Sequence, residues 1–282
     1  MIKPGLYKDI SNYTYHASSA LSRSDIMKFI KSPYHFNNRH LTPFKETEAM
    51  NLGSLVHSLI LEPHLVEKEY FFYKKIDKRT KKGKIDYNDM LASSKGMVSI
   101  NEETAKTAYE MRTAVKSNSY ACELLEGCLI EPSIFWRNDK SGLELKSRPD
   151  AMKDDGDNKV MVVDLKTTKD ASQHKFQRSC IDFGYFHQAA TASLALESTG
   201  KEMTHFMIIA VENTAPFATA IYEISSDTIK KVCNELKGIY LEISNCKKND
   251  AWPSYGFNTL SIPNYMLTKQ NKESEKDAAI NF

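Results

Sequence analysis

Two aspartates and a lysine have the side chains and the spacing best suited to chemistry in this sequence. Asp150 ends a segment Arg-Pro-Asp, and fourteen residues later Asp164 begins a segment Asp-Leu-Lys that ends at Lys166. Two carboxylates held close together repel each other unless a cation lies between them, and a hard divalent ion meets that need. A lysine beside such an ion can hold water and offset charge that develops on a phosphate. The pattern therefore indicates metal-assisted hydrolysis.

Two neighbouring strands must position these residues. Residues 143–152 and 159–165 alternate as strands do, and turn-forming residues lie between them at 154–158. In an antiparallel pair joined by so short a turn, Asp150 and Asp164 lie side by side.

The second strand sets the directions of its side chains. With a period of two, Asp164 and Lys166 share one face, and Leu165 points into the core. The apolar run at residues 160–163 is typical of a central strand, whose end then carries the charged residues. Taken alone, the same charged residues would also suit an ordinary exposed strand end.

A histidine and a glutamate extend this candidate site. His57 follows Gly53 by one helical turn, so the glycine removes bulk on the face where a ligand would approach. Glu131, near the start of the first predicted strand, can bring a third carboxylate to the same rim. The local sequence is equally compatible with a hydrogen-bonded surface histidine and an ordinary exposed glutamate.

Helices come first along the chain, and strands follow. Apolar spacing predicts helices over residues 21–36, 46–61, 102–125, 185–197 and 227–245. Ser22 or Ser24 caps the first helix, Pro33 ends it, and Ser226 caps the last. Alternation predicts strands over residues 130–137, 143–152, 159–165, 205–212 and 217–224. This order is typical of an α/β domain with a central mixed β-sheet flanked by helices.

The chain length suits one large domain, which we predict over residues 1–268. Its helical N-terminal part covers about 20–125 and its catalytic sheet core about 128–225. A C-terminal helix and extension follow over 226–268, and the polar residues 269–282 are predicted to form a disordered tail.

The charges almost cancel over the whole chain but not along it. Lys and Arg number 38 against 36 Asp and Glu, a formal net charge of +2, which argues against a basic-tail protein. Between residues 74 and 84, however, seven basic residues face one acid. In this run, four side chains are candidates for contact with a DNA backbone: Lys78, Arg79, Lys81 and Lys82. A solvated loop is the alternative.

Two further features of the sequence bear on the cellular compartment of the protein. No apolar stretch approaches the ~20 residues of a membrane helix, and the first residues lack an apolar signal segment. The five cysteines are scattered without a Cys-x-x-Cys pair, which argues against a zinc finger or an iron–sulfur cluster. We therefore expect a cytoplasmic protein with reduced cysteines and no membrane partner.

In their order along the chain, these residues resemble the PD-(D/E)xK nuclease superfamily in its RecB-like branch. The chain is most similar to the nuclease domain of the exonuclease VIII family, from about residue 10 to 265. The matching stretches are Gly53-x-x-x-His57, Glu131-Pro132, Arg148-Pro149-Asp150, Asp164-Leu165-Lys166-Thr167, Tyr185-Phe186-His187-Gln188 and Trp252-Pro253. The resemblance implies a restriction-endonuclease-like core.

The resemblance also implies a metal site. Asp150, Asp164 and the Leu165 carbonyl would bind catalytic Mg²⁺, with Mn²⁺ as the alternative, at one or two ions per site. His57 would be a further ligand. Glu131 would serve a second metal ion or its water.

Other roles follow from the same resemblance. Lys166 would position the attacking water, and Gln188 would contact DNA or hold Lys166 and the metal cluster in register. Ala192 stands where such enzymes often have a tyrosine, and Tyr185 is a candidate to fill that space and to contact DNA. Apart from the resemblance, Arg23 is a candidate to bind a terminal 5′-phosphate, because it lies at the start of the first predicted helix, whose N-terminal amides favour anions; an ordinary surface arginine is the alternative.

The implied activity is that of a Mg²⁺-dependent exodeoxyribonuclease. By resemblance it digests double-stranded DNA ends in the 5′→3′ direction and leaves 3′ single strands for an annealing protein in recombination, in a phage or prophage setting. Family members form rings, so a ring-shaped homo-oligomer is expected. The alternatives are an endonuclease or single-strand nuclease of phage defence or repair, and a catalytically silent DNA-binding module.

Overall fold

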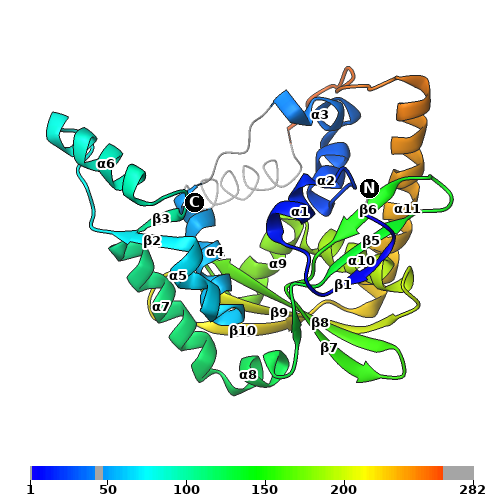
Figure 1. The fold of residues 1–282 in the computed structure, drawn as a ribbon. Helices are drawn as coiled ribbons and strands as arrows, with labels where there is room; N and C mark the ends of the chain where they lie inside the picture. The colour runs from blue at the N-terminus through cyan, green and yellow to red at the C-terminus, as the bar shows by residue number, and fades with distance from the viewer. Residues whose placement is uncertain (1, 42–46, 263–282) are drawn as a thin grey trace, which may run out of the picture. The chain divides into compact units, whose positions relative to one another are not determined.

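A computed structural model of the chain describes residues 2–41 and 47–262. Contacts divide the chain into two units, residues 1–252 and residues 253–282. All the helices and strands below belong to the first unit (Figure 1). The described part of the second unit, residues 253–262, has no regular secondary structure. The tail predicted over 269–282 lies outside the described residues.

The central sheet has five strands in the order β10-β9-β8-β7-β4. They are β4 (Leu129–Ile130), β7 (Ala151–Gly156), β8 (Lys159–Thr168), β9 (Glu202–Glu212) and β10 (Thr219–Glu223). β8 and β9 are parallel, and the other neighbours are antiparallel. The prediction of an α/β fold with a mixed sheet flanked by helices is therefore confirmed.

Two smaller sheets accompany the central one. β1 (Gly5–Tyr7), β5 (Ser133–Arg137) and β6 (Glu144–Ser147) form a three-stranded sheet with β5 in the middle. β2 (Tyr70–Tyr73) and β3 (Val98–Asn101) form a parallel pair.

Two of the predicted strands are each divided between the small and the central sheet. The stretch 130–137 becomes β4 and β5, separated by Glu131 and Pro132, and Glu131 has a left-handed backbone with φ of 45°. The stretch 143–152 becomes β6 and β7, separated at Pro149. Proline cannot donate a ladder hydrogen bond and restricts the residue before it, so each continuous strand was the wrong prediction.

Helices α4 (Glu48–Leu61), α7 (Glu102–Ser117) and α8 (Ser119–Leu125) pack on one face of the sheet. Their apolar side chains form a cluster with alternate residues of the central strands, including Val163, Leu165 and Ile209. A single helix over 102–125 was predicted, but Asn118 ends α7 and its side chain accepts the Ala121 N–H to cap α8.

Helices α10 (Tyr185–Glu197) and α11 (Ser226–Asn249) cover the opposite face, together with α9 (Gln173–Asp182). α10 has the predicted bounds. Ser225 rather than Ser226 caps α11. The sequence analysis missed α9, because that segment is mostly polar and buries only Phe176 and Cys180.

The remaining helices are short or lie away from the sheet. The N-terminal region holds α1 (Asn12–Ala17), α2 (Arg23–Lys31), α3 (Pro33–Asn37) and a 3₁₀ turn (Arg39–Leu41). A second 3₁₀ turn (Pro63–Leu65), α5 (Val66–Glu69) and α6 (Lys81–Ser93) follow, and Figure 1 shows α6 projecting away from the central sheet.

Two predictions need correction here. Pro33 does not simply end the first helix, because it occupies the first turn of α3, where its missing N–H costs nothing. The basic run 74–84 is not all loop, since Thr80 caps α6 and the last lysines lie in its first turn. None of the helices in the described part of the chain combines the length and the apolar character of a membrane-spanning segment.

Candidate active site

Asp150 and Asp164 lie side by side where β7 begins. Ala151 of β7 pairs with Val163 of antiparallel β8, so the next pair in that register joins the two aspartates. The Leu165 N–H donates to Asp150 Oδ2 at 2.8 Å, and the Leu165 side chain is only 1% exposed. The juxtaposition predicted from the sequence is therefore present, with Leu165 directed into the core.

The carboxylate of Asp164 is buried and held by two side chains. Lys166 Nζ lies 2.5 Å from its Oδ2, and Gln188 of α10 donates from Nε2 to its Oδ1 at 2.5 Å. Lys166 Nζ also lies 5.0 Å from the centre of the Tyr185 ring. Because α10 starts at Tyr185, one helix supplies both the amide and the aromatic ring.

The electrostatic balance of this pair keeps Lys166 charged. Burial lowers the pKa of Lys166, but the negative charges of Asp164 and Asp150 outweigh that effect, so its pKa is raised. Burial is also the largest influence on Asp164, and it raises the pKa of that carboxyl. An ammonium with a raised pKa is suited to electrostatic stabilisation rather than to accepting a proton.

His57 and Glu131 reach the same rim from other elements. His57 Nδ1, on α4, lies 3.5 Å from Asp150 Oδ2. The Glu131 N–H donates to the Asp150 carbonyl oxygen at 2.9 Å, which fixes the break after β4 beside the site. The pKa of Glu131 is raised by burial first, and then by the charges of Glu62 and Asp150.

Gly53 of α4 lies against β8. A Cβ at this position would lie 3.4 Å from Thr167 Oγ1, so the glycine lets α4 pack closely against β8. Gly53 also lines a small pocket together with His57. His57, one turn later on the same helix, lies beside Asp150.

Arg148 joins the site to the N-terminal segment, a role that the sequence analysis did not assign. Its guanidinium donates to Ser133 Oγ at 2.9 and 2.7 Å, to the Ile10 carbonyl oxygen at 2.7 Å, and to Asn12 Oδ1. It also lies over the Tyr15 ring at 4.3 Å. The only sequence signal was its place before Pro149, which does not reveal partners so distant along the chain.

The candidates for DNA contact fall into two groups. Arg23 and Tyr185 belong to the surroundings of the site, because each interacts electrostatically with Asp164. The other four lie on the segment that leads into α6. Lys78 is placed over the Tyr87 ring at 4.1 Å, and Arg79 is paired with Asp77 at 2.8 Å.

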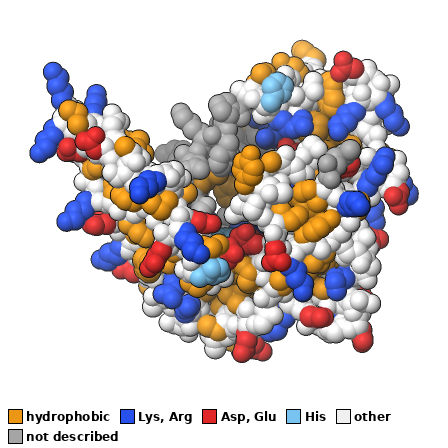
Figure 2. All heavy atoms as spheres, viewed as in Figure 1, with side chains coloured by type: hydrophobic (Ala, Val, Ile, Leu, Met, Phe, Trp, Pro, Cys, Tyr) orange, Lys and Arg blue, Asp and Glu red, His pale blue; other side chains and the backbone are white. Residues whose placement is uncertain are grey.

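Lys81 and Lys82 are exposed in the first turn of α6. Among the described residues, no hydrogen bond or ion pair joins Lys78, Arg79, Lys81 or Lys82 to the two aspartates. Figure 2 shows basic side chains along the projecting α6 and, nearer the middle of this face, acidic side chains gathered beside a histidine.

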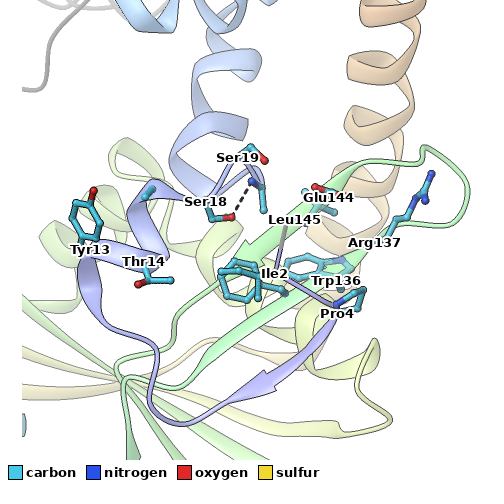
Figure 3. Close-up of a pocket in the computed structure, with 13 residues that line it drawn as sticks. Ile2, Pro4, Tyr13, Thr14, Ser18, Ser19, Trp136, Arg137, Glu144 and Leu145 are labelled. Carbon is cyan, nitrogen blue, oxygen red and sulfur yellow. Dashed lines mark hydrogen bonds between the residues drawn. The ribbon is translucent and has the colours of Figure 1, made fainter.

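Two pockets of opposite charge flank the carboxylate pair. One, of about 790 Å³, includes Gln188 and several basic side chains, and we call it the basic pocket. The other, of about 270 Å³, is lined by His57 and three glutamates, and we call it the acidic pocket. A separate cavity of about 610 Å³ lies over the small sheet and is lined by Ile2, Trp136 and Leu145 among others (Figure 3).

The donor set fits a divalent ion that keeps part of its water shell. No group of three His, Cys, Asp or Glu side chains within residues 2–41 and 47–262 is arranged to hold a metal ion alone. Mg²⁺, however, is usually bound by one or two carboxylates together with substrate phosphates and waters. Asp164 Oδ2 is buried, and among the described residues its near neighbour is the Lys166 ammonium, with Nζ 2.5 Å away. This oxygen and Asp150 can therefore accept such an ion.

Comparison with known proteins shows which family of folds the chain has. A family model described as "PDDEXK-like domain of unknown function (DUF3799)" matches residues 22–259. The crystal structure of a "putative exonuclease" from Eubacterium rectale aligns with a TM-score of 0.59 at 15% identity, covering 92% of this chain and 98% of that chain. At this identity the likeness concerns the fold alone.

Two other comparisons add little. The crystal structure of the protein SSO0001 aligns only weakly, with a TM-score of 0.29 at 14% identity, covering 66% of this chain and 85% of that chain. No curated protein matches the chain.

Proposed function

Because the chain belongs to this PDDEXK-like family, we propose that it is a nuclease that hydrolyses phosphodiester bonds of DNA with a divalent metal ion. The observation that most directly supports this function is the meeting of Asp150, Asp164 and Lys166 at one end of two central strands. The family match confirms the predicted PD-(D/E)xK superfamily, and the RecB-like branch stays a prediction. The narrower resemblance to exonuclease VIII stays a prediction.

The proposed mechanism assigns a separate task to each residue. Asp150, Asp164 and the Leu165 carbonyl would hold the ion, which when bound polarises the phosphate and lowers the pKa of a water molecule. Lys166, charged at neutral pH, positions the attacking water and offsets negative charge on the phosphate. Gln188 keeps Asp164 in its orientation.

His57 and Glu131 are proposed to support the metal from the acidic-pocket side. His57 lies next to Asp150 and can be a further ligand, while Glu131 can serve a second ion or its water. Mg²⁺ is the proposed ion, and Mn²⁺ is the alternative, because both accept carboxylate oxygens.

For the substrate, we propose double-stranded DNA ends digested 5′→3′. This proposal is supported by the resemblance of the motifs to the exonuclease VIII family. The 3′ single strands that remain would serve an annealing protein in recombination. A ring-shaped homo-oligomer belongs to the same proposal, and sedimentation that finds a stable monomer under active conditions would contradict it.

The experiment uses end-labelled linear duplex DNA and the purified protein. We expect degradation with Mg²⁺ and none with EDTA. Asp164→Asn should abolish the activity, whereas Asp157→Asn, which removes the same charge from the exposed β7–β8 turn, should leave it intact. No degradation by the wild type with either Mg²⁺ or Mn²⁺ would refute the enzyme and favour a silent DNA-binding module.

Substrate form separates the remaining alternatives. A covalently closed circle offers no end, so an exonuclease leaves it intact. Cleavage of the circle would assign an endonuclease instead. A labelled 5′ end compared with a labelled 3′ end gives the polarity, and single-stranded DNA tested alongside gives the strand preference.

A further inference from the structure

Phe183 is a large apolar residue whose ring is mostly exposed near the carboxylate pair. It is 61% exposed and lies at the corner between α9 and α10, two residues before Tyr185. Single exposed apolar side chains are ordinary on protein surfaces. Phe183 differs from such residues because its neighbours hold the ring in a fixed place close to Lys166.

Among the described residues, four aromatic rings contact one another in series, and Phe183 is at one end. Tyr222 and Phe176 stack with their ring centres 5.0 Å apart. Phe176 lies 6.0 Å from Tyr185, and Tyr185 stacks on Phe183 at 5.9 Å with the ring planes 28° apart. Phe176 is only 2% exposed, so the series leads from a buried ring to an exposed one. The exposed end can add a further flat ring in the same way.

The series also brings Phe183 close to the proposed centre of hydrolysis. Lys166 Nζ lies 5.0 Å from the centre of the Tyr185 ring, which lies 5.9 Å from the Phe183 ring, so Phe183 is within about 11 Å of this ammonium. At about 3.4 Å for each nucleotide of a stacked strand, this distance is no more than about three nucleotide steps. A strand with one phosphate at the carboxylates can therefore place a nearby base against Phe183.

The backbone that carries the ring is held against α2. Arg23 Nη1 donates to the Phe183 carbonyl oxygen at 2.8 Å, and the Phe183 N–H donates to the Ser179 carbonyl oxygen at 2.9 Å. Gly184 has a left-handed backbone with φ of 67°, and a Cβ there would lie 2.8 Å from Met27 Cε. The corner is thus closely packed. A ring that is already ordered loses little entropy when it binds a ligand.

A flat apolar ring beside a centre that cleaves phosphodiesters suits one part of a nucleic acid, the face of a nucleobase. Phosphates are charged and sugars carry hydroxyl or ether oxygens, whereas every base has a π-face that stacks on aromatic side chains. Inside a duplex, both faces of a base are covered by its neighbours. A free face is available on an unpaired base or on the last pair of a duplex end.

We propose that Phe183 is a stacking platform for a nucleobase at a strand end, within a few nucleotides of the phosphate that is cleaved. This inference rests on the proposed nuclease function and adds to it a contact with the bases of the substrate. The base is either unpaired or the outer member of the terminal pair, and both present the same face. Because every base has such a face, the contact is independent of sequence.

The test measures equilibrium binding of short fluorescent duplexes in EDTA, so that binding is separated from hydrolysis. One duplex is blunt, a second has mismatched terminal pairs, and in a third abasic residues replace those unpaired bases. Phe183→Leu removes the ring but keeps an apolar side chain, and Phe183→Tyr retains a ring. Tyr120→Leu, at a 71% exposed position on α8, is the matched control. Hydrolysis with Mg²⁺ is recorded in parallel.

We expect wild type to bind the mismatched duplex about tenfold more tightly than the abasic one, because one base stacks on the ring. Phe183→Leu should abolish this preference, whereas Phe183→Tyr and Tyr120→Leu should keep it. Both duplexes are compared on the same variant, so partial unfolding cannot imitate the loss. If the ligand is the terminal pair, Phe183→Leu also weakens binding of the blunt duplex; if it is an unpaired base, the blunt duplex binds unchanged.

Two results would overturn the inference. One is a ratio of the two affinities, mismatched to abasic, that is the same in wild type and Phe183→Leu. The other is a loss in Phe183→Leu that also occurs in Phe183→Tyr, since stacking requires only the ring. Hydrolysis by wild type would leave the nuclease function standing in both cases. If wild type binds DNA without hydrolysing it, the nuclease proposal fails and the binding ratio still decides about Phe183; absence of all binding would refute both.

Discussion

Asp164 and Lys166 place two opposite charges where water reaches neither of them freely. The Asp164 residue is 1% exposed, and the Lys166 side chain is 15% exposed. Removing two charges from water is costly, and their mutual attraction repays this only in part. Such a pair is poorly explained as a stabilising contact and well explained as a group that awaits a metal ion and a phosphate.

Lys166→Met tests the proposed role of the ammonium, because methionine keeps much of the length of the side chain without its charge. We expect the rate of DNA hydrolysis to fall by about 10³-fold, since the phosphate loses a nearby cation in the transition state. Binding of DNA without turnover should persist, as it should in Asp164→Ala. Lys159→Met, at the exposed start of β8, is the control. Full activity of Lys166→Met would contradict the mechanism.

The same pair predicts a dependence of stability on pH in the absence of metal. Burial raises the pKa of Asp164, so this carboxyl favours the folded state most when it is protonated. Its contribution is complete below the unfolded value of about 3.9 and is lost as the pH rises through the raised folded value. The pKa of Lys166 is raised above that of an ordinary lysine, so it does not titrate in this range.

The double variant Asp164→Asn/Lys166→Met removes both charges. In EDTA we expect it to be more stable than wild type at about pH 8, by on the order of 1 kcal/mol, and to lose that advantage toward about pH 5. Thermal melts at both pH values give the comparison. An advantage that does not change with pH would show that ionisation of Asp164 is not its source.

Two prolines that interrupt the strands, together with helix α10, position the residues of the site. Pro132 and Pro149 each direct the chain from one sheet to the other, and Glu131 and Asp150 lie at the two crossings. α10 then places Gln188 against Asp164 from above the sheet face. The sequence displays both prolines, but apolar alternation continues on either side of them. Alternation alone therefore predicted two long strands where four short ones form.

A capping box at the N-terminus of α2 supports the wall of the basic pocket. The Asp25 N–H donates to Ser22 Oγ, and Asp25 Oδ2 accepts the Ser22 N–H, which forms a capping box. We expect Ser22→Ala to lower the free energy of unfolding by about 1 kcal/mol. Chemical denaturation measures the change, with Ser24→Ala in the first turn as control. Equal stability of the two variants would contradict the role of the cap.

Within residues 1–252, the site draws on segments far apart in the sequence. Arg148 ties the segment around Ile10 and Asn12 to Ser133, and α4 brings His57 to Asp150. Binding of a metal ion at the carboxylates should therefore be visible in the stability of the whole unit, because an ion that binds only the folded state shifts the unfolding equilibrium.

A metal titration followed by thermal melting makes this quantitative. At roughly a hundredfold excess over the dissociation constant, Mg²⁺ should add about 2.7 kcal/mol to the free energy of unfolding. Asp150→Asn should lose most of this gain, whereas Asp157→Asn should keep it. Equal stabilisation of both variants would place the ion elsewhere.

The sequence by itself determined the larger helices α4, α10 and α11, the strands β8, β9 and β10, and the group at the centre of the site. Asp150, Asp164 and Lys166 could be placed together because a strand has a fixed period and a short turn fixes the pairing of its neighbours. The position of Gln188 on α10 followed from resemblance to a family. Strand period and turn length are local rules, and a family resemblance is a match of sequences. Neither requires knowledge of the three-dimensional structure.

Only the tertiary structure decided what surrounds that centre. The carbonyl oxygens that hold Lys146 and Arg23 are more than a hundred residues away along the chain, and so are the partners of Arg148 near the N-terminus. Gly53 makes room for Thr167 of a distant strand. No local period encodes such contacts, because packing of the whole unit selects them. The opposite charges of the two pockets beside the carboxylates therefore became visible only in the folded chain.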